Sequence, residues 1–148
     1  MKHFADWLSL ALWLAGMGHF CILFASFQVP SRLGWKRDLS KLTPFNRKLM
    51  WVYGGTTLQT IIAFGIMTLF LHNQFLSGER GACTLAAFIA IFWTTRILVD
   101  FFYFEHSDWP QGTQFVIGHI LLTALFVVLA STYWAVVIWS LTKSPTGA

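Results

Sequence analysis

Charged residues are scarce in this chain, and their scarcity excludes several classes of protein. Only 11% of the 148 residues are Asp, Glu, Lys or Arg, whereas soluble domains carry roughly 25%. A disordered chain combines low hydrophobicity with high charge, so the composition excludes one. Two cysteines are too few for a disulfide scaffold. The composition also argues against a soluble enzyme domain.

Apolar residues are abundant instead. Hydrophobic residues make up 56% of the sequence and aromatic residues 18%, and the mean hydropathy is +0.61. A helix of about 20 apolar residues crosses a bilayer core about 30 Å thick. Four such stretches occur, at residues 4–27, 49–71, 82–104 and 115–141. They use most of the chain, so we expect a single all-α domain, an up-and-down bundle of four transmembrane helices.

The first span raises the question of a cleaved signal peptide. Lys2 could mark a basic n-region, and an apolar stretch follows it. That stretch is longer than the 7–15 residues of a typical signal-peptide core, it contains His19, and no clean A-x-A site follows. We therefore expect the first span to be retained as a membrane helix.

Basic residues in the loops predict the orientation of the chain. The first loop carries Arg32, Lys36, Arg37, Lys41, Arg47 and Lys48, whereas the opposite side carries Lys2, Arg80 and Lys143. The positive-inside rule places the first loop in the cytoplasm and both termini outside, as in a protein of a bacterial inner membrane. Most of the net charge of +4 lies in this loop. The charge thus fits an anionic membrane face and requires no nucleic-acid partner.

The first loop also has a helical pattern. Trp35, Leu39 and Leu42 recur at i, i+4 and i+7, and the basic residues lie largely on other faces. This pattern is typical of a short helix lying in the membrane interface. A solvated basic loop is the alternative, because Gly34 weakens a helix. The pair Thr43-Pro44 predicts the N-cap and first turn of the second span.

Polar residues within the spans are the candidates for function, because they are costly to place in lipid. Helices rise about 1.5 Å per residue, which puts the strongest polar groups about 6–12 Å from the cytoplasmic ends of their spans. These groups are His19, Tyr53, Thr57, Arg96, Asp100 and His119. All four helices contribute to the set. We therefore expect the six residues to converge in one ligand-binding pocket in the cytoplasmic half.

Arg96 and Asp100 are four residues apart and so share one side of a helix. An isolated Arg in lipid would cost several kcal/mol, and pairing with Asp100 would lower that cost. The rings of Phe92 and Trp93, one turn earlier, could cover the guanidinium. The pair is either a neutral lock on helix rotation or part of a site for an anion, a polar headgroup or a proton.

His19 and His119 each follow a glycine, which would let a flat ligand approach. Two histidines on different helices could bind the iron of haem b, or contact a quinone carbonyl. With Asp100 they would also form the two-histidine, one-carboxylate set that suits iron. His106 and Asp108 add metal-binding side chains in the third loop, although a solvated turn explains them as well. Neutral imidazoles hydrogen-bonded across helices are the simplest alternative.

No motif for nucleophilic catalysis is visible, so the sequence assigns no reaction. Its leading interpretation is a small integral membrane protein whose intramembrane site binds a lipophilic redox ligand, a quinone or haem. An accessory subunit of a larger membrane complex is the first alternative. A small transporter or channel formed by a homo-oligomer is the second, because one four-helix bundle encloses little volume.

Overall fold

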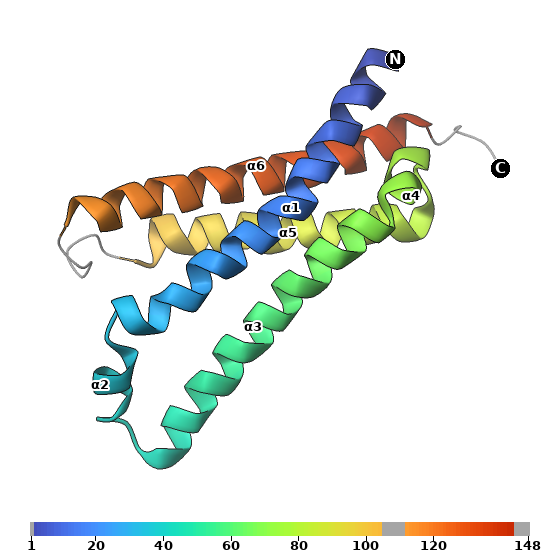
Figure 1. Cartoon of the computed structure of the whole chain (residues 1–148). Coiled ribbons are helices and arrows are strands. Elements are labelled where there is room, and N and C mark those ends of the chain that lie inside the picture. Colours follow the sequence, from blue (N-terminus) through green and yellow to red (C-terminus); the bar gives the residue numbers. More distant parts are fainter. Residues whose placement is uncertain (1, 105–111, 144–148) are drawn as a thin grey trace.

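The computed structural model describes residues 2–104 and 112–143, and these form helices with no strand (Figure 1). The six helices are α1 (Lys2–Arg32), α2 (Trp35–Leu39), α3 (Pro44–Phe70), α4 (His72–Ser77), α5 (Arg80–Phe102) and α6 (Thr113–Lys143). Four of them, α1, α3, α5 and α6, are long and apolar enough to cross a membrane. The all-helical fold is thereby confirmed, with four long apolar helices that could span a membrane. His106 and Asp108 lie outside the described residues.

The long helices extend past the expected spans. α1 and α6 have 31 residues each, which makes each about 46 Å long at 1.5 Å per residue. This exceeds a hydrocarbon core of about 30 Å, so their ends project from it or the helices tilt. α3 begins where the sequence predicts. Thr43 is its N-cap and accepts a hydrogen bond from the backbone N–H of Asn46, and Pro44 follows in the first turn.

Two short helices lie in the connections. The expected helix of the first loop is present as α2, and it starts after Gly34, whose φ of 65° is in the left-handed region. The ring of Trp35 packs on that of Trp51 of α3, with centroids 5.9 Å apart. The second connection, between the spans expected at 49–71 and 82–104, is not a loop throughout. It contains α4, which ends at Gly78 with φ 80°.

The four long helices pack as two hairpins. α1 packs along α3, and α5 packs along α6, while α1 and α4 also contact α6. The hairpins meet at the end that holds α4, where the ring of Phe4 lies 5.3 Å from that of Trp139. Toward α2 they diverge (Figure 1). We call the half with α4, the start of α1 and the end of α6 the closed half, and the half with α2 and residues 44–60 of α3 the open half.

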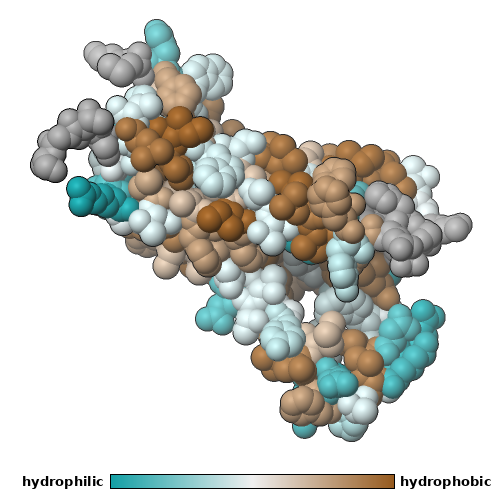
Figure 2. Space-filling model, turned by 180° about the vertical axis from the view of Figure 1, so that it is seen from behind, coloured by the Kyte–Doolittle hydropathy of each residue, from teal (hydrophilic) through white to brown (hydrophobic). Residues whose placement is uncertain are grey.

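The core is concentrated where the hairpins meet. Side chains that are entirely enclosed include Leu12, Phe75, Ile89, Leu129 and Tyr133. By contrast, no residue of α3 between positions 44 and 60 is buried. Brown apolar side chains cover much of the outer surface in Figure 2, and teal hydrophilic ones gather beside α2 and the start of α3. An apolar exterior suits lipid, and the hydrophilic end suits water or headgroups.

Small residues allow the helices of the first hairpin to approach closely. A Cβ added at Gly65 of α3 would lie 3.1 Å from the Cβ of His19 and 3.1 Å from the ring of Phe20, both on α1. These distances are tighter than ordinary contacts between side chains. Glycine at this position therefore sets how near α3 comes to α1, as small residues do in membrane helix pairs.

Candidate functional site

His19 lies in the core, where both of its ring nitrogens are engaged. Its side chain has no exposed surface. Nδ1 lies 2.7 Å from the carbonyl oxygen of Ala15, one turn earlier in α1. The indole N–H of Trp93 in α5 donates to Nε2 at 3.2 Å. Because Nε2 accepts, the proton sits on Nδ1 and the imidazole is neutral. His19 thus ties α1 to α5 through a satisfied buried hydrogen bond.

Aromatic rings enclose His19. The centroids of Phe64, Trp93 and Tyr133 lie 6.0, 5.6 and 5.9 Å from that of the imidazole. The Tyr133 hydroxyl hydrogen-bonds to Thr68, whose own hydroxyl donates to the carbonyl of Phe64 at 2.6 Å. Every long helix therefore contributes to this cluster, which is packed and hydrogen-bonded without an added ligand.

Asp100 and His119 meet at the seam between α5 and α6. The hydroxyl of Thr123 donates to Asp100 Oδ2 at 3.0 Å, and His119 Nε2 lies 3.4 Å from the same oxygen. The carboxylate side chain is 11% exposed and the imidazole 23%. The pair is therefore largely enclosed, and it joins α5 to α6 through polar contacts.

The expected ion pair between Arg96 and Asp100 is not formed, and this expectation was wrong. Within the described parts of the chain, the only group within ion-pair distance of Asp100 is His119. Residues four apart on a helix differ by about 40° in direction. Both side chains reach α6, but they meet different residues of that helix. The guanidinium carbon of Arg96 lies 5.9 Å from the centroid of the Phe126 ring instead.

Arg96 also lines a groove on the outer face of α5. The groove has a volume of about 270 Å³ and is lined by Phe88, Ile91, Phe92, Thr95, Arg96 and Val99. Arg96 is the one charged residue among them, and it is exposed. The surface that faces the groove is almost entirely apolar, so the stem of Arg96, rather than its guanidinium, lines the groove.

α3 contacts α5 beside this groove. The ring of Phe64 in α3 packs on those of Phe88 and Phe92, with centroids 6.0 and 5.2 Å away. Tyr53 and Thr57 precede Phe64 by 11 and 7 residues, which places them on the same stripe of α3. Both are exposed, and the Thr57 hydroxyl donates to the Tyr53 carbonyl at 2.9 Å. They thus extend, in the open half, the side of α3 that touches α5.

The six expected site residues accordingly fall into three groups. His19 is in the core, Asp100 and His119 share the α5–α6 seam, and the exposed members are Arg96 on α5 with Tyr53 and Thr57 on α3. The partners described above for His19 are not those of Asp100 and His119. No group of three or more His, Cys, Asp or Glu that could hold a metal ion occurs in residues 2–104 and 112–143.

Sequence reasoning missed a second polar cluster, at the closed half. His72 of α4 is buried, with Nε2 3.0 Å from the hydroxyl of Ser9 and its ring 5.1 Å from that of Trp13. Its Nδ1 has no hydrogen-bond partner among the described residues, and burial lowers the pKa of the imidazole. None of the four expected spans includes His72. The sequence signal for the contact with His72 is the spacing of Ser9 and Trp13, which are four residues apart and so lie on one face of α1.

The end of α6 holds α4 in place. The carbonyl of Leu76 accepts hydrogen bonds from the indole of Trp139 at 3.1 Å and from the ammonium of Lys143 at 2.8 Å. The hydroxyl of Ser140 donates to the carbonyl of Gly78 at 3.3 Å. Donors at the C-terminal end of a helix satisfy carbonyls that lack a partner within it. α4 therefore packs between the two hairpins and is held by hydrogen bonds from α6.

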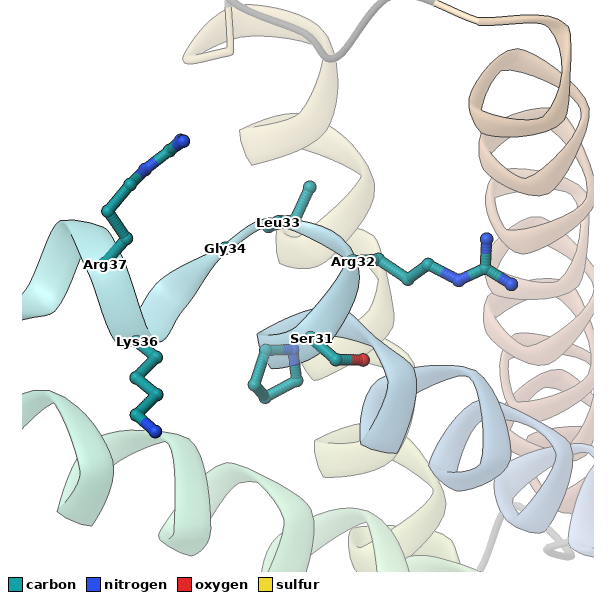
Figure 3. A pocket seen from close by; sticks show the side chains of 7 residues that line it. Ser31, Arg32, Leu33, Gly34, Lys36 and Arg37 are labelled. Carbon is teal, nitrogen blue, oxygen red and sulfur yellow. The ribbon is translucent and has the colours of Figure 1, made fainter.

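The corner between α1 and α2 forms a further recess of about 520 Å³, lined by residues of both elements. Figure 3 shows its three cationic side chains, Arg32, Lys36 and Arg37, pointing in different directions. The Arg37 guanidinium lies 3.3 Å from the carboxylate of Asp38. The cations do not converge, so this corner is not built to hold one small anion.

Comparison of the chain with protein-family models, with curated proteins and with solved structures found no match.

Proposed function

We propose that this chain is an integral membrane protein that binds a lipophilic molecule of the quinone class beside Arg96, in the cytoplasmic half of the membrane. The observation that carries the proposal is the apolar groove on α5 that the exposed residue Arg96 helps to line. A guanidinium has five hydrogen-bond donors and no acceptor, so the ligand must present acceptors. A quinone has two carbonyl acceptors on an apolar ring, and a hydrocarbon tail that belongs in lipid.

The walls around Arg96 suit such a ring. Phe88 and Phe92 line the groove and offer aromatic faces and edges for stacking. Tyr53 and Thr57 lie on the stripe of α3 that continues from Phe64, and in this proposal they supply further polar groups beside the ligand. In this proposal Arg96 binds one carbonyl, and the aromatic residues hold the ring plane.

Asp100 and His119 have a secondary role in the proposal. Asp100 lies one turn beyond Arg96 on α5. Its carboxylate is 3.4 Å from the imidazole of His119 on α6. Such a pair offers a hydrogen-bond acceptor and an imidazole close to the bound ligand. The geometry favours a quinone over haem ligated by two histidines, because an iron bond to His19 would break its hydrogen bond with Trp93.

The proposal includes a topology. The first loop lies in the cytoplasm and both termini lie outside, in a bacterial inner membrane, as the excess of Lys and Arg in that loop indicates. α2 rests in the membrane interface of the bundle. The divergent cations at its corner favour an extended layer of anionic headgroups over a single bound anion.

An accessory role in a larger assembly is the second candidate, and one observation favours it. Residues 44–60 of α3 have no buried member, although tertiary packing usually encloses part of a membrane helix. A neighbouring protein could cover this part of α3. The transporter alternative also requires several chains. No feature of the described residues favours it over the accessory role.

Quinone binding to the purified chain in lipid nanodiscs tests the proposal. Nanodiscs are equilibrated with decylubiquinone, and the quinone retained per protein is measured by its absorbance after extraction. Empty nanodiscs correct for partition into lipid. We expect saturable binding by the wild type, and at least about tenfold weaker binding by Arg96→Gln, which corresponds to the loss of about 1.4 kcal/mol.

Arg80→Gln is the matched control, because Arg80 is also an exposed arginine of α5 but lies at its opposite end. It should bind quinone as the wild type does. The proposal is wrong if the wild type retains no more quinone than empty nanodiscs, or if Arg96→Gln and Arg80→Gln bind equally.

A further inference from the structure

One face of α3 consists of residues that are exposed in the described structure. The buried residues of α3 are Ile61, Phe64, Gly65 and Thr68. At 100° per residue, the opposite side of the helix carries a different stripe, whose members span about 80°. This stripe consists of Val52, Gly55, Gln59, Ile62 and Ile66, and all five are exposed. It therefore faces away from α1 and from the Arg96 groove, into the membrane.

A primary amide stands in the middle of this stripe. Gln59 lies near the centre of α3, about 22 Å along the helix from Pro44. Neighbouring hydroxyls are satisfied within the helix, since Thr56 and Thr60 donate to its backbone carbonyls. The side chain of Gln59 makes no hydrogen bond within residues 2–104 and 112–143. An amide in hydrocarbon without a partner is strongly unfavourable, so Gln59 requires one from outside the chain.

We propose that this stripe is the contact surface of a homodimer, in which the Gln59 amides of two chains hydrogen-bond to each other. A primary amide has both donors and an acceptor, so two copies related by a two-fold axis satisfy each other. Copies in one membrane share their orientation, so the two α3 helices run parallel. This inference is independent of quinone binding. It identifies the surface of α3 through which the two chains of the homodimer associate.

The shape of the stripe fits a close helix pair. A Cβ added at Gly55, one turn before Gln59, would have no atom within 4 Å. A second backbone can therefore approach there, as it does at small residues in membrane dimers. Val52, Ile62 and Ile66 supply apolar contact on both sides of the amide. Lys48 is the charged residue on the same stripe, and it lies toward the water-facing end, where salt screens the repulsion between two copies.

Energy transfer between labelled copies in liposomes tests the dimer. The full chain is fused at its C-terminus to donor or acceptor fluorescent proteins, and transfer is measured against the protein-to-lipid ratio. We expect specific transfer for the wild type, and association about tenfold weaker for Gln59→Leu. Gln59→Asn keeps an amide and should retain most of the association. Gly55→Leu, which blocks the approach of the backbones, should weaken it.

Gln28→Leu is the control for added hydropathy. Gln28 is an exposed glutamine of α1, and its amide already donates to the carbonyl of Phe24 at 3.4 Å, so this variant should associate as the wild type does. Helical content and thermal unfolding show whether each variant is folded. Transfer at the random level for the wild type overturns the proposal, as does wild-type association of a folded Gln59→Leu variant. Association only with a different added membrane protein would also overturn it.

Discussion

In the closed half, polar side chains find partners on other helices. His19 bonds to Trp93, Tyr133 to Thr68, and His72 to Ser9. In the open half fewer polar groups are enclosed: Asp100 still meets His119 and Thr123 across the α5–α6 seam, but others are exposed. Thr57 bonds only to its own helix, and Arg96 lines an exposed groove. The convergence of the hairpins, and not depth along each helix, therefore separates buried polar groups from exposed ones.

Two identical dipeptides make this difference concrete. Gly18-His19 and Gly118-His119 have the same local sequence. A Cβ added at Gly18 would lie 3.2 Å from Cδ1 of Leu125, whereas one added at Gly118 would have no atom within 4 Å. His19 is fully enclosed, but 23% of the His119 side chain is exposed. The neighbours that tertiary structure brings to each dipeptide decide its role.

The largest effect should come from truncating the two histidines. His19→Ala leaves a cavity and an unpaired indole N–H on Trp93, so we expect a loss of about 3 kcal/mol in the free energy of unfolding. His119→Ala removes a half-exposed contact with Asp100 and should cost about 1 kcal/mol. Denaturation in mixed micelles measures both. Equal losses would contradict the distinction between the two halves.

Adding a methyl group should have a smaller effect, with opposite signs in the two halves. Gly65→Ala places a Cβ 3.1 Å from that of His19 and forces α1 and α3 apart, so we expect a loss of about 1–2 kcal/mol. Gly118→Ala meets no neighbour and removes a helix-destabilising glycine, so a gain of up to about 1 kcal/mol is expected. The same denaturation experiment measures the pair, and a stabilised Gly65→Ala variant would refute the close packing.

The smallest effect should be a pH dependence at the closed half. Burial lowers the pKa of His72 from 6.5, so the folded state binds fewer protons than the unfolded state below that pH. The stability contributed by neutral His72 is full above pH 6.5 and decreases as the pH falls through the range below it. Its contacts Ser9 and Trp13 carry no charge that would oppose this. Thermal unfolding between pH 5 and 8 measures the slope, and His72→Gln should flatten it; an unchanged slope would remove His72 as the cause.

Much of the fold could be predicted from local sequence. The four spans follow from hydropathy, because the cost of placing each residue in lipid is mostly a property of that residue. The start of α3 follows from Thr43 and Pro44, whose capping chemistry acts within one turn. α4 was missed because its stability comes from outside it. Trp139 and Lys143 of α6 hold its Leu76 carbonyl, and six residues alone make a weak helix.

The candidate site was predictable in composition but not in arrangement. The sequence identifies Arg96, Asp100 and His119 as costly groups at similar depth. Spacing along α5 places Arg96 and Asp100 on one side, yet a difference of about 40° sends them to different neighbours. Which neighbour lies at each angle depends on how α6 packs on α5. No pattern within one helix contains that information.

The sequence by itself determined that the chain is helical, apolar over four spans and basic in its first loop, because hydropathy, capping and charge act residue by residue. Only the tertiary structure decided that His19 is enclosed while Arg96 and Gln59 are exposed. The physical reason is the crossing of the two hairpins. Contacts between distant residues, such as Gly65 against His19 and α4 against the end of α6, bring one half together. Residues 44–60 of α3 have no buried member, and they diverge from the hairpin of α5 and α6 (Figure 1).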